Sequence, residues 1–104
     1  MSRKAEYYEF DSFPRSYNAL HLEAREDIRR IGRDRGWMAL PRIKSVLFVQ
    51  RGNYTYAEDS IESPHQIGQP VGVGFAKSRP TDKYDENIGR RIAMRRAIED
   101  AVSG

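Results

Sequence analysis

The sequence contains no cysteine and only two histidines, and long hydrophobic runs are missing. Without cysteine there can be no disulfide, thiolate zinc site or cysteine nucleophile, and we expect a cytoplasmic location. His21 and His65 lack the spacing of metal ligands, so we expect no metal site. No stretch approaches the ~20 apolar residues of a membrane span, and no apolar segment follows the start. We therefore expect neither a secretory signal nor a membrane partner.

Lysine is also scarce, because only four of the 18 basic residues are lysines and the other 14 are arginines. The net charge is +3, which is basic without being extreme. One explanation for the arginines is GC-rich coding. The other is chemical, since the planar guanidinium binds phosphate and carboxylate bidentately and stacks on bases. The composition leaves both explanations open.

The remaining composition is that of a folded domain. Hydrophobic residues make up 38% of the chain, charged residues 32% and aromatic residues 11%. These fractions are too apolar for a disordered chain. We expect residues 1–104 to form a single domain with a modest core, and the marginal stability of so small a domain favours a homo-oligomer.

Residues 1–15 form an aromatic N-terminal arm. The alternation at Tyr8 and Phe10 predicts a short edge strand. The arm either folds back over its own core or docks on a partner. In the second case we expect Tyr7, Tyr8 and Phe10, together with Trp37, to be the partner-binding residues.

A helix is predicted after the arm, because apolar residues recur at spacings of three and four from Tyr17 to Ile31. Ser16 is the predicted N-cap, and Gly36 is predicted to end the helix. The opposite face of this helix is charged. One ridge of it carries three arginines: Arg25, Arg29 and Arg33.

Strands are predicted at 44–50, 54–57 and 71–76. The first has four consecutive apolar residues, which indicates burial on both faces and a central position in the sheet. Turn residues at 51–53 join the first two strands into a hairpin. Residues 58–70 are polar and contain two prolines, which predicts a surface loop.

The third strand has one face of small residues: Gly72, Gly74 and Ala76. A final helix is predicted over 86–102 with a stripe of small residues at every fourth position: Gly89, Ala93, Ala97 and Ala101. A glycine face suits close approach, so either this stripe packs against it or a flat ligand occupies the space. The predicted fold is α+β, a small antiparallel sheet of three or more strands packed by an N-terminal and a C-terminal helix.

Signatures of catalysis are lacking. The serines lie in no nucleophile elbow, and Gly72-x-Gly74 lacks the third glycine of a phosphate-cradling loop. Adjacent carboxylates point apart on a helix and suit surface or capping roles. We therefore expect no catalytic residues and no cofactor, and a protein that acts by binding.

Basic residues gather near the C-terminus and form a candidate ligand-binding set: Lys77, Arg79, Arg91, Arg95 and Arg96. Arg91 and Arg95 are like charges four residues apart, which destabilises an isolated helix. Arginines on this helix need anionic partners, and within the chain Glu99 could pair with Arg95 and Asp100 with Arg96. Otherwise an external anion completes the site, and phosphate is a common one.

The C-terminal third carries a motif over roughly residues 70–98. A strand ends in Gly-x-Ala-x, a Pro-x-Asp turn follows, and a helix then reads Gly-Arg-x-Ile-Ala-x-x-Arg-Ala, carried by Gly89, Arg90, Ile92, Ala93, Arg96 and Ala97. This motif resembles one found in small phage and prophage proteins. It is also similar to the Thoeris anti-defence proteins, which sequester cyclic ADP-ribose-type signals in pockets between subunits.

The resemblance implies a phage-type binding protein in the host cytoplasm that sequesters a phosphate-bearing small molecule. It also implies that Arg79 and Arg96 contact phosphate. Two alternatives remain open. The chain could be a nucleic-acid-binding module that uses the arginine ridge at 25, 29 and 33 with the aromatic arm. It could instead inhibit a host enzyme, with four aromatic anchors: Tyr7, Tyr8, Phe10 and Trp37.

Overall fold

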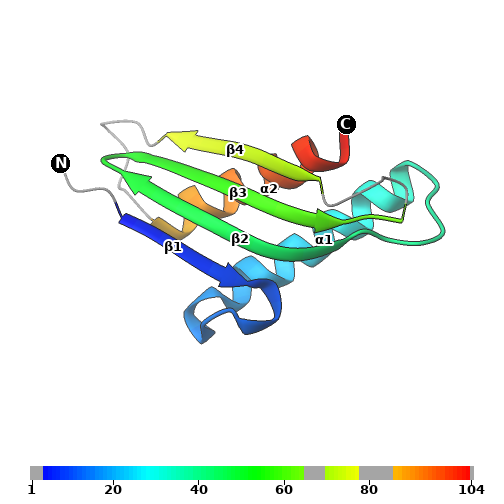
Figure 1. Ribbon diagram of the computed structural model, residues 1–104, viewed down its shortest axis with the longest axis horizontal. Helices are drawn as coiled ribbons and strands as arrows, with labels where there is room; N and C mark the ends of the chain where they lie inside the picture. The colour runs from blue at the N-terminus through cyan, green and yellow to red at the C-terminus, as the bar shows by residue number, and fades with distance from the viewer. Residues whose placement is uncertain (1–3, 65–69, 78–85, 104) are drawn as a thin grey trace.

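The computed structural model describes residues 4–64, 70–77 and 86–103 (Figure 1). Five elements precede the C-terminal half of the sheet: strand β1, two short 3₁₀ helices η1 and η2, helix α1 and strand β2. Strands β3 and β4 and helix α2 follow. Their bounds, in chain order, are Lys4–Glu9, Phe10–Ser12, Arg15–Tyr17, Asn18–Asp34, Arg42–Arg51, Tyr54–Glu62, Val71–Lys77 and Glu86–Ser103.

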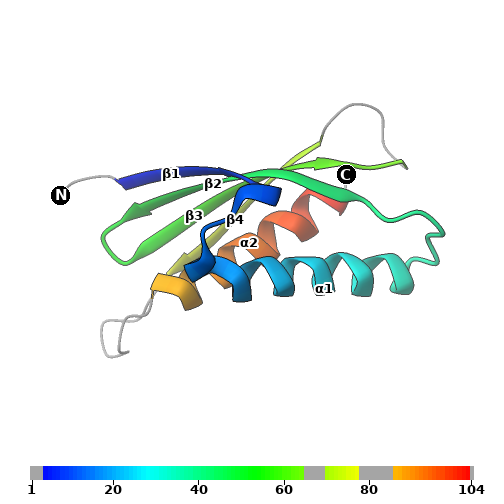
Figure 2. The ribbon, with the colours of Figure 1, turned by 90° about the horizontal axis from the view of Figure 1, so that it is seen from below.

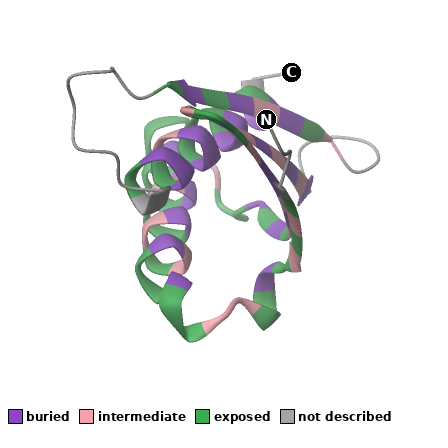
Figure 3. Cartoon of the chain, turned by 90° about the vertical axis from the view of Figure 1, so that its left-hand side faces the viewer, coloured by how far each residue is buried: buried purple, intermediate pink, exposed green. Residues whose placement is uncertain are grey.

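The four strands form one antiparallel sheet in the order β1-β2-β3-β4. Figure 2 shows both helices beneath the same face of this sheet. Figure 3 shows buried and more exposed positions alternating along the strands, most regularly in β3 and β4. The predicted α+β fold, with one helix from each end of the chain on a small antiparallel sheet, is confirmed. Neither described helix is long and apolar enough to cross a membrane.

The N-terminal arm becomes part of the fold. Its predicted edge strand is present as β1, which among the described strands pairs with β2 alone; Tyr8 lies in this strand, whereas Phe10 begins η1. Helix α1 begins at Asn18, one residue later than predicted, because Ser16 lies inside η2 and Tyr17 takes the N-cap position. Gly36 follows the helix at φ 68°, a left-handed conformation that glycine adopts freely, so the predicted end of the helix is confirmed.

The predicted loop at 58–70 is wrong over its first five residues, because β3 continues to Glu62. Along β3 the buried residues alternate regularly, and Ala57, Asp59 and Ile61 all point toward the helices. Asp59 conceals this alternation in the sequence, since a carboxylate ordinarily marks an exposed position. The strand is therefore recognisable only once Asp59 is known to be buried.

The tightest contact in the fold joins β4 to α2. Gly72 and Gly74 face the helix, and a Cβ built on Gly74 would lie 2.9 Å from the Cβ of Arg96. A Cβ on Gly72 would lie 2.7 Å from that of Ala101. The small residues of α2 are fully or almost fully buried there. The prediction that the small-residue stripe packs on the glycine face is confirmed for Ala93, Ala97 and Ala101, whereas Gly89 lies against Thr55 of β3.

Two side chains of α2 occupy the edge of β4 that no other strand pairs with. The backbone N–H of Val73 donates to Oδ2 of Asp100 at 2.9 Å, and Nη1 of Arg96 donates to the Phe75 carbonyl at 2.6 Å. Arg96 and Asp100 thus bind backbone groups instead of each other. Because these contacts occupy edge groups, they block strand-to-strand association along this part of β4.

A buried polar cluster ties the first strand to the last helix. Glu6 on β1 accepts hydrogen bonds from the hydroxyls of Tyr8 at 3.0 Å and Tyr17 at 2.8 Å. Arg90 on α2 lies 3.4 Å from the same carboxylate, and its side chain is only 4% exposed. Its guanidinium also lies over the rings of Tyr17 and Phe48. A buried ion pair of this kind is costly to break, so it fixes β1 against the core.

Asp59 is different, because it is fully buried and neither carboxylate oxygen has a hydrogen-bond partner among the described residues. Burial raises the pKa of Asp59 well above its ordinary value, because a charged carboxylate is poorly solvated in the core. The folded state therefore favours the neutral acid. Deprotonation at higher pH must weaken the fold.

Replacing Gly74 with alanine should destabilise the protein by about 1–3 kcal/mol, because the new methyl group overlaps α2. The sign of this change in stability is diagnostic, because alanine in place of glycine in an uncrowded strand stabilises the protein by about 0.5–1 kcal/mol. Urea denaturation of the wild type and of Gly74→Ala measures the difference. An unchanged or higher free energy of unfolding would show that β4 and α2 are not in close contact.

The raised pKa of Asp59 predicts a stability that changes with pH. In the window between the unfolded pKa near 4 and the higher folded pKa, the folded state binds the extra proton. Stability should therefore fall as pH rises through this window, by up to about 1.4 kcal/mol per pH unit. Asp59→Asn should match the wild type near pH 4 and exceed it at pH 7.

The control is Asp34→Asn, which changes an exposed carboxylate at the end of α1. It should leave the pH dependence unchanged. Chemical denaturation between pH 4 and pH 8 gives all three profiles. Parallel curves for the wild type and Asp59→Asn would mean that the Asp59 carboxyl is solvated in the folded protein.

Candidate anion-binding cleft

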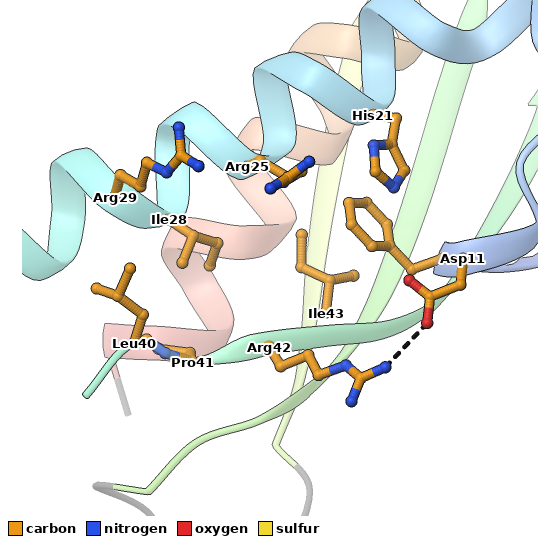
Figure 4. A pocket seen from close by; sticks show the side chains of 10 residues that line it. Asp11, His21, Arg25, Ile28, Arg29, Leu40, Pro41, Arg42 and Ile43 are labelled. Carbon is orange, nitrogen blue, oxygen red and sulfur yellow. Dashed lines mark hydrogen bonds and ion pairs between the residues drawn. The ribbon is translucent and has the colours of Figure 1, made fainter.

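A cleft of about 470 Å³ lies between α1 and the segment that leads into β2 (Figure 4). One wall is formed by successive turns of α1, and the other by the chain from Leu40 to Ile43. The 3₁₀ helix η1 closes one end with Phe10 and Asp11. Three elements distant in the sequence therefore meet at this site.

The floor of the cleft is apolar. Phe10, Ile28 and Ile43 belong to the core and are each less than 10% exposed, while Leu40 and Pro41 extend the apolar surface toward the rim. Ile28 lies in the cleft because it belongs to the buried stripe of α1. The floor therefore offers an apolar contact surface that the core holds rigidly in place.

His21 stacks on Phe10 at the same end of the cleft. The two ring centroids are 4.1 Å apart and the planes are nearly parallel, at 15°. Burial and the charge of Arg25 lower the pKa of His21, with burial the larger cause. The neutral imidazole is thus favoured. Because Phe10 is buried and covers one face of this ring, His21 is the partly exposed member of the stacked pair.

Three arginines stand at the rim. Arg25 and Arg29 come from consecutive turns of α1, and Arg42 comes from the first residue of β2 across the cleft (Figure 4). Arg29 binds Glu26 at 2.9 Å, and Arg42 binds Asp11 at 2.9 Å. Both ion pairs are largely exposed, so each is worth little and exchanges readily.

Arg25 has no ion pair or hydrogen bond with any other residue in the described part of the chain. Its guanidinium nevertheless lies over the cleft, beside His21 (Figure 4). The cleft lining holds three arginines and a single carboxylate, that of Asp11, and is therefore positively charged. An anion with a flat apolar part fits this combination of rim and floor. Over residues 4–64, 70–77 and 86–103 we find no cluster of carboxylates and histidines that could hold a metal ion.

Of the basic residues predicted near the C-terminus, Arg91 and Arg95 lie together against α1, whereas Arg96 and Lys77 lie elsewhere. Arg91 binds Glu23 of α1 at 3.0 Å, Arg95 lies near Asp27 of the same helix, and Arg96 binds the backbone of β4. Lys77 lies on the opposite face of the sheet, with its Nζ 5.1 Å from the ring centre of Tyr54. Arg79 lies outside the described residues.

The four aromatic anchors do not share a surface either. Tyr7 points away from the helices and is 62% exposed, whereas Tyr8 and Phe10 pack into the core. Trp37 is partly buried at the far end of α1, beside the guanidinium of Arg35. A single partner docking on all four residues would require the arm to leave the fold.

The arginine ridge predicted from the sequence supplies two residues of the cleft, although no cleft was predicted there. The ridge at 25, 29 and 33 includes Arg25 and Arg29, and Arg33 does not line the cleft. Arg42 and His21 were not marked as ligand-binding residues. No local signal identifies Arg42, because its position opposite α1 depends on where the chain returns after Gly36.

No protein family, curated protein or solved structure matches this chain. The resemblance of residues 70–98 to phage proteins therefore stays a prediction. The functional argument rests on the geometry and charge of the described residues. Among these, the cleft beside α1 brings an apolar floor and cationic side chains together.

Proposed function

We propose that this chain is a non-enzymatic binding protein whose cleft holds a phosphate-bearing small molecule with a flat apolar part. The observation that carries the proposal is the rim guanidinium of Arg25, which has no carboxylate partner among the described residues and lies over a cleft of about 470 Å³. Arg29 and Arg42 flank it from two different elements. Three guanidinium groups around one cleft favour an anion with several oxygens.

Phosphate suits these arginines better than a carboxylate does. A phosphate or pyrophosphate group can accept from several guanidinium forks at once, and arginine is well shaped for such bidentate contacts. Glu26 and Asp11 can be displaced from Arg29 and Arg42 at small cost, because both pairs are exposed. The rim can therefore reorganise around an incoming anion.

The floor accounts for the second part of the ligand. His21, whose ring stacks on the buried Phe10, is the partly exposed ring of the cleft, and Ile28 and Ile43 also line it. Flat aromatic groups bind such surfaces by stacking and by burial of apolar area. The cleft volume falls within the range of about 300–1,000 Å³ found for small-molecule sites. A nucleotide or a similar phosphate ester has the required chemistry.

The same arginines give less support to the alternative in which the chain binds nucleic acid. Two of the three rim arginines already neighbour carboxylates, Glu26 and Asp11, which repel a continuous polyanion. Arg33 continues the ridge of α1 but lies outside the cleft. The cationic surface is thus short, and a compact anion matches it better than a strand of phosphates.

Arg25→Gln should weaken binding of ADP about ten- to a hundredfold, the effect of losing a hydrogen bond to a charged group. Isothermal titration calorimetry with ADP, inorganic pyrophosphate and adenosine measures it. ADP should bind more tightly than either of the other two, because it uses both rim and floor. The free energy of unfolding should hardly change, since Arg25 is exposed.

Arg33→Gln is the matched control, because it removes an arginine of the same helix that does not line the cleft. It should leave the affinity for ADP unchanged. Two results contradict the proposal: no heat with either ADP or pyrophosphate at millimolar concentration, or equal losses in both variants. Tight binding of a single-stranded oligonucleotide that falls steeply with salt would instead support a nucleic-acid partner.

A further inference from the structure

The face of the sheet opposite the helices is not covered by any described element (Figures 1 and 2). Its residues are apolar to an unusual degree for an exposed surface. Tyr7 on β1, Tyr54 on β3, and Val71 and Phe75 on β4 are each about half exposed or more. Leu47 and Val49 of β2 lie between them with Tyr56 and line a shallow hollow of about 390 Å³. A contiguous patch of this kind marks an interaction surface.

Most of the charges on this face lie near its two ends. The strand register aligns Arg51, Tyr54 and Lys77 in one row at the end of the sheet near the β2–β3 turn. Glu9 lies three rows away, in the row that contains Ser45 and Ser60. Neither Arg51 nor Glu9 has an ion-pair partner among the described residues. The face therefore has a positive end and a mostly apolar middle that contains Glu58. At the other end Arg42 and Lys44 pair with Asp11 and Glu62, which leaves Glu9 as a negative charge.

Association along the β4 edge is blocked, because Arg96 and Asp100 already bind backbone groups there. The β1 edge and the open face remain, and of these two the open face carries the contiguous apolar patch. A polyanion suits this face poorly, because Glu58 stands in its middle, where it accepts from the Tyr56 hydroxyl at 2.7 Å. The occupant must match a surface whose charges balance.

We propose that the occupant is a second copy of this chain, packed face to face. The two copies are related by a two-fold axis that lies in the plane between the two sheets and runs perpendicular to the strands. This axis reverses the order of the rows and places the positive end of each copy over the negative end of the other. Arg51 then lies opposite Ser45 of the second copy, one strand away from Glu9. An isologous pair of this kind buries the aromatic rows of both copies and forms two reciprocal Arg51–Glu9 contacts.

Sedimentation equilibrium over about 1–200 µM tests the proposal. The wild type should be a dimer, and Phe75→Asp should raise the dimer dissociation constant about a hundredfold, because it buries a charge in the apolar middle of the interface. Leu22→Asp is the control. Leu22 is 60% exposed on α1, away from the open face, so this variant should remain a dimer.

A charge exchange tests the orientation of the two copies. Arg51→Glu and Glu9→Arg should each raise the dissociation constant about tenfold, and the double variant should restore it, because the two charges are only interchanged. Circular dichroism checks that every variant is folded. The proposal is overturned if the wild type is monomeric, whether or not it binds single-stranded oligonucleotides. It is also overturned if Phe75→Asp dimerises as tightly as Leu22→Asp. A double charge variant with a higher dimer dissociation constant than either single variant contradicts it as well.

Discussion

The architecture depends on the close contact between the glycine face of β4 and the small-residue stripe of α2. Gly72 and Gly74 leave no room for a side chain, and Ala97 lies between the two positions. This contact commits α2 to one face of the sheet. It also brings Arg96 and Asp100 near enough to bind the edge of β4. A larger residue on either side would separate the two elements.

The two helices consequently meet the sheet in different ways. Where α2 is held close by small residues, α1 is separated from the sheet by large ones, with the rings of Tyr17 and Phe48 6.2 Å apart. The cleft forms on this second side, where Ile28 and Ile43 fill only part of the space between α1 and β2. Because both helices occupy one face, the other remains open. The cleft and the open apolar face thus both follow from how the two helices pack on one face of the sheet.

Features set by short-range periodicity could be predicted from the sequence. The spacing in α1, the alternation in β4 and the small residues of α2 each report a local geometry, and together they predicted the helix–strand contact. Features that depend on distant partners could not. Arg91 pairs with Glu23, which is 68 positions away in the sequence. The part of β3 that contains Asp59 was not predicted, because the burial of this carboxylate depends on the packing of the whole core. Arg25 was noticed as part of a charged ridge, yet Arg42 on the opposite wall carries no local signal.

The central claim is that the cleft between α1 and β2 is the ligand site. Two-dimensional ¹H–¹⁵N correlation spectra recorded during a titration with ADP test it most directly. The account predicts that the largest shift changes occur at His21, Arg25 and Arg42, including the Nε–H signals of the two arginines. Changes centred on Arg91 and Arg95, or no change at saturating ADP, would contradict it.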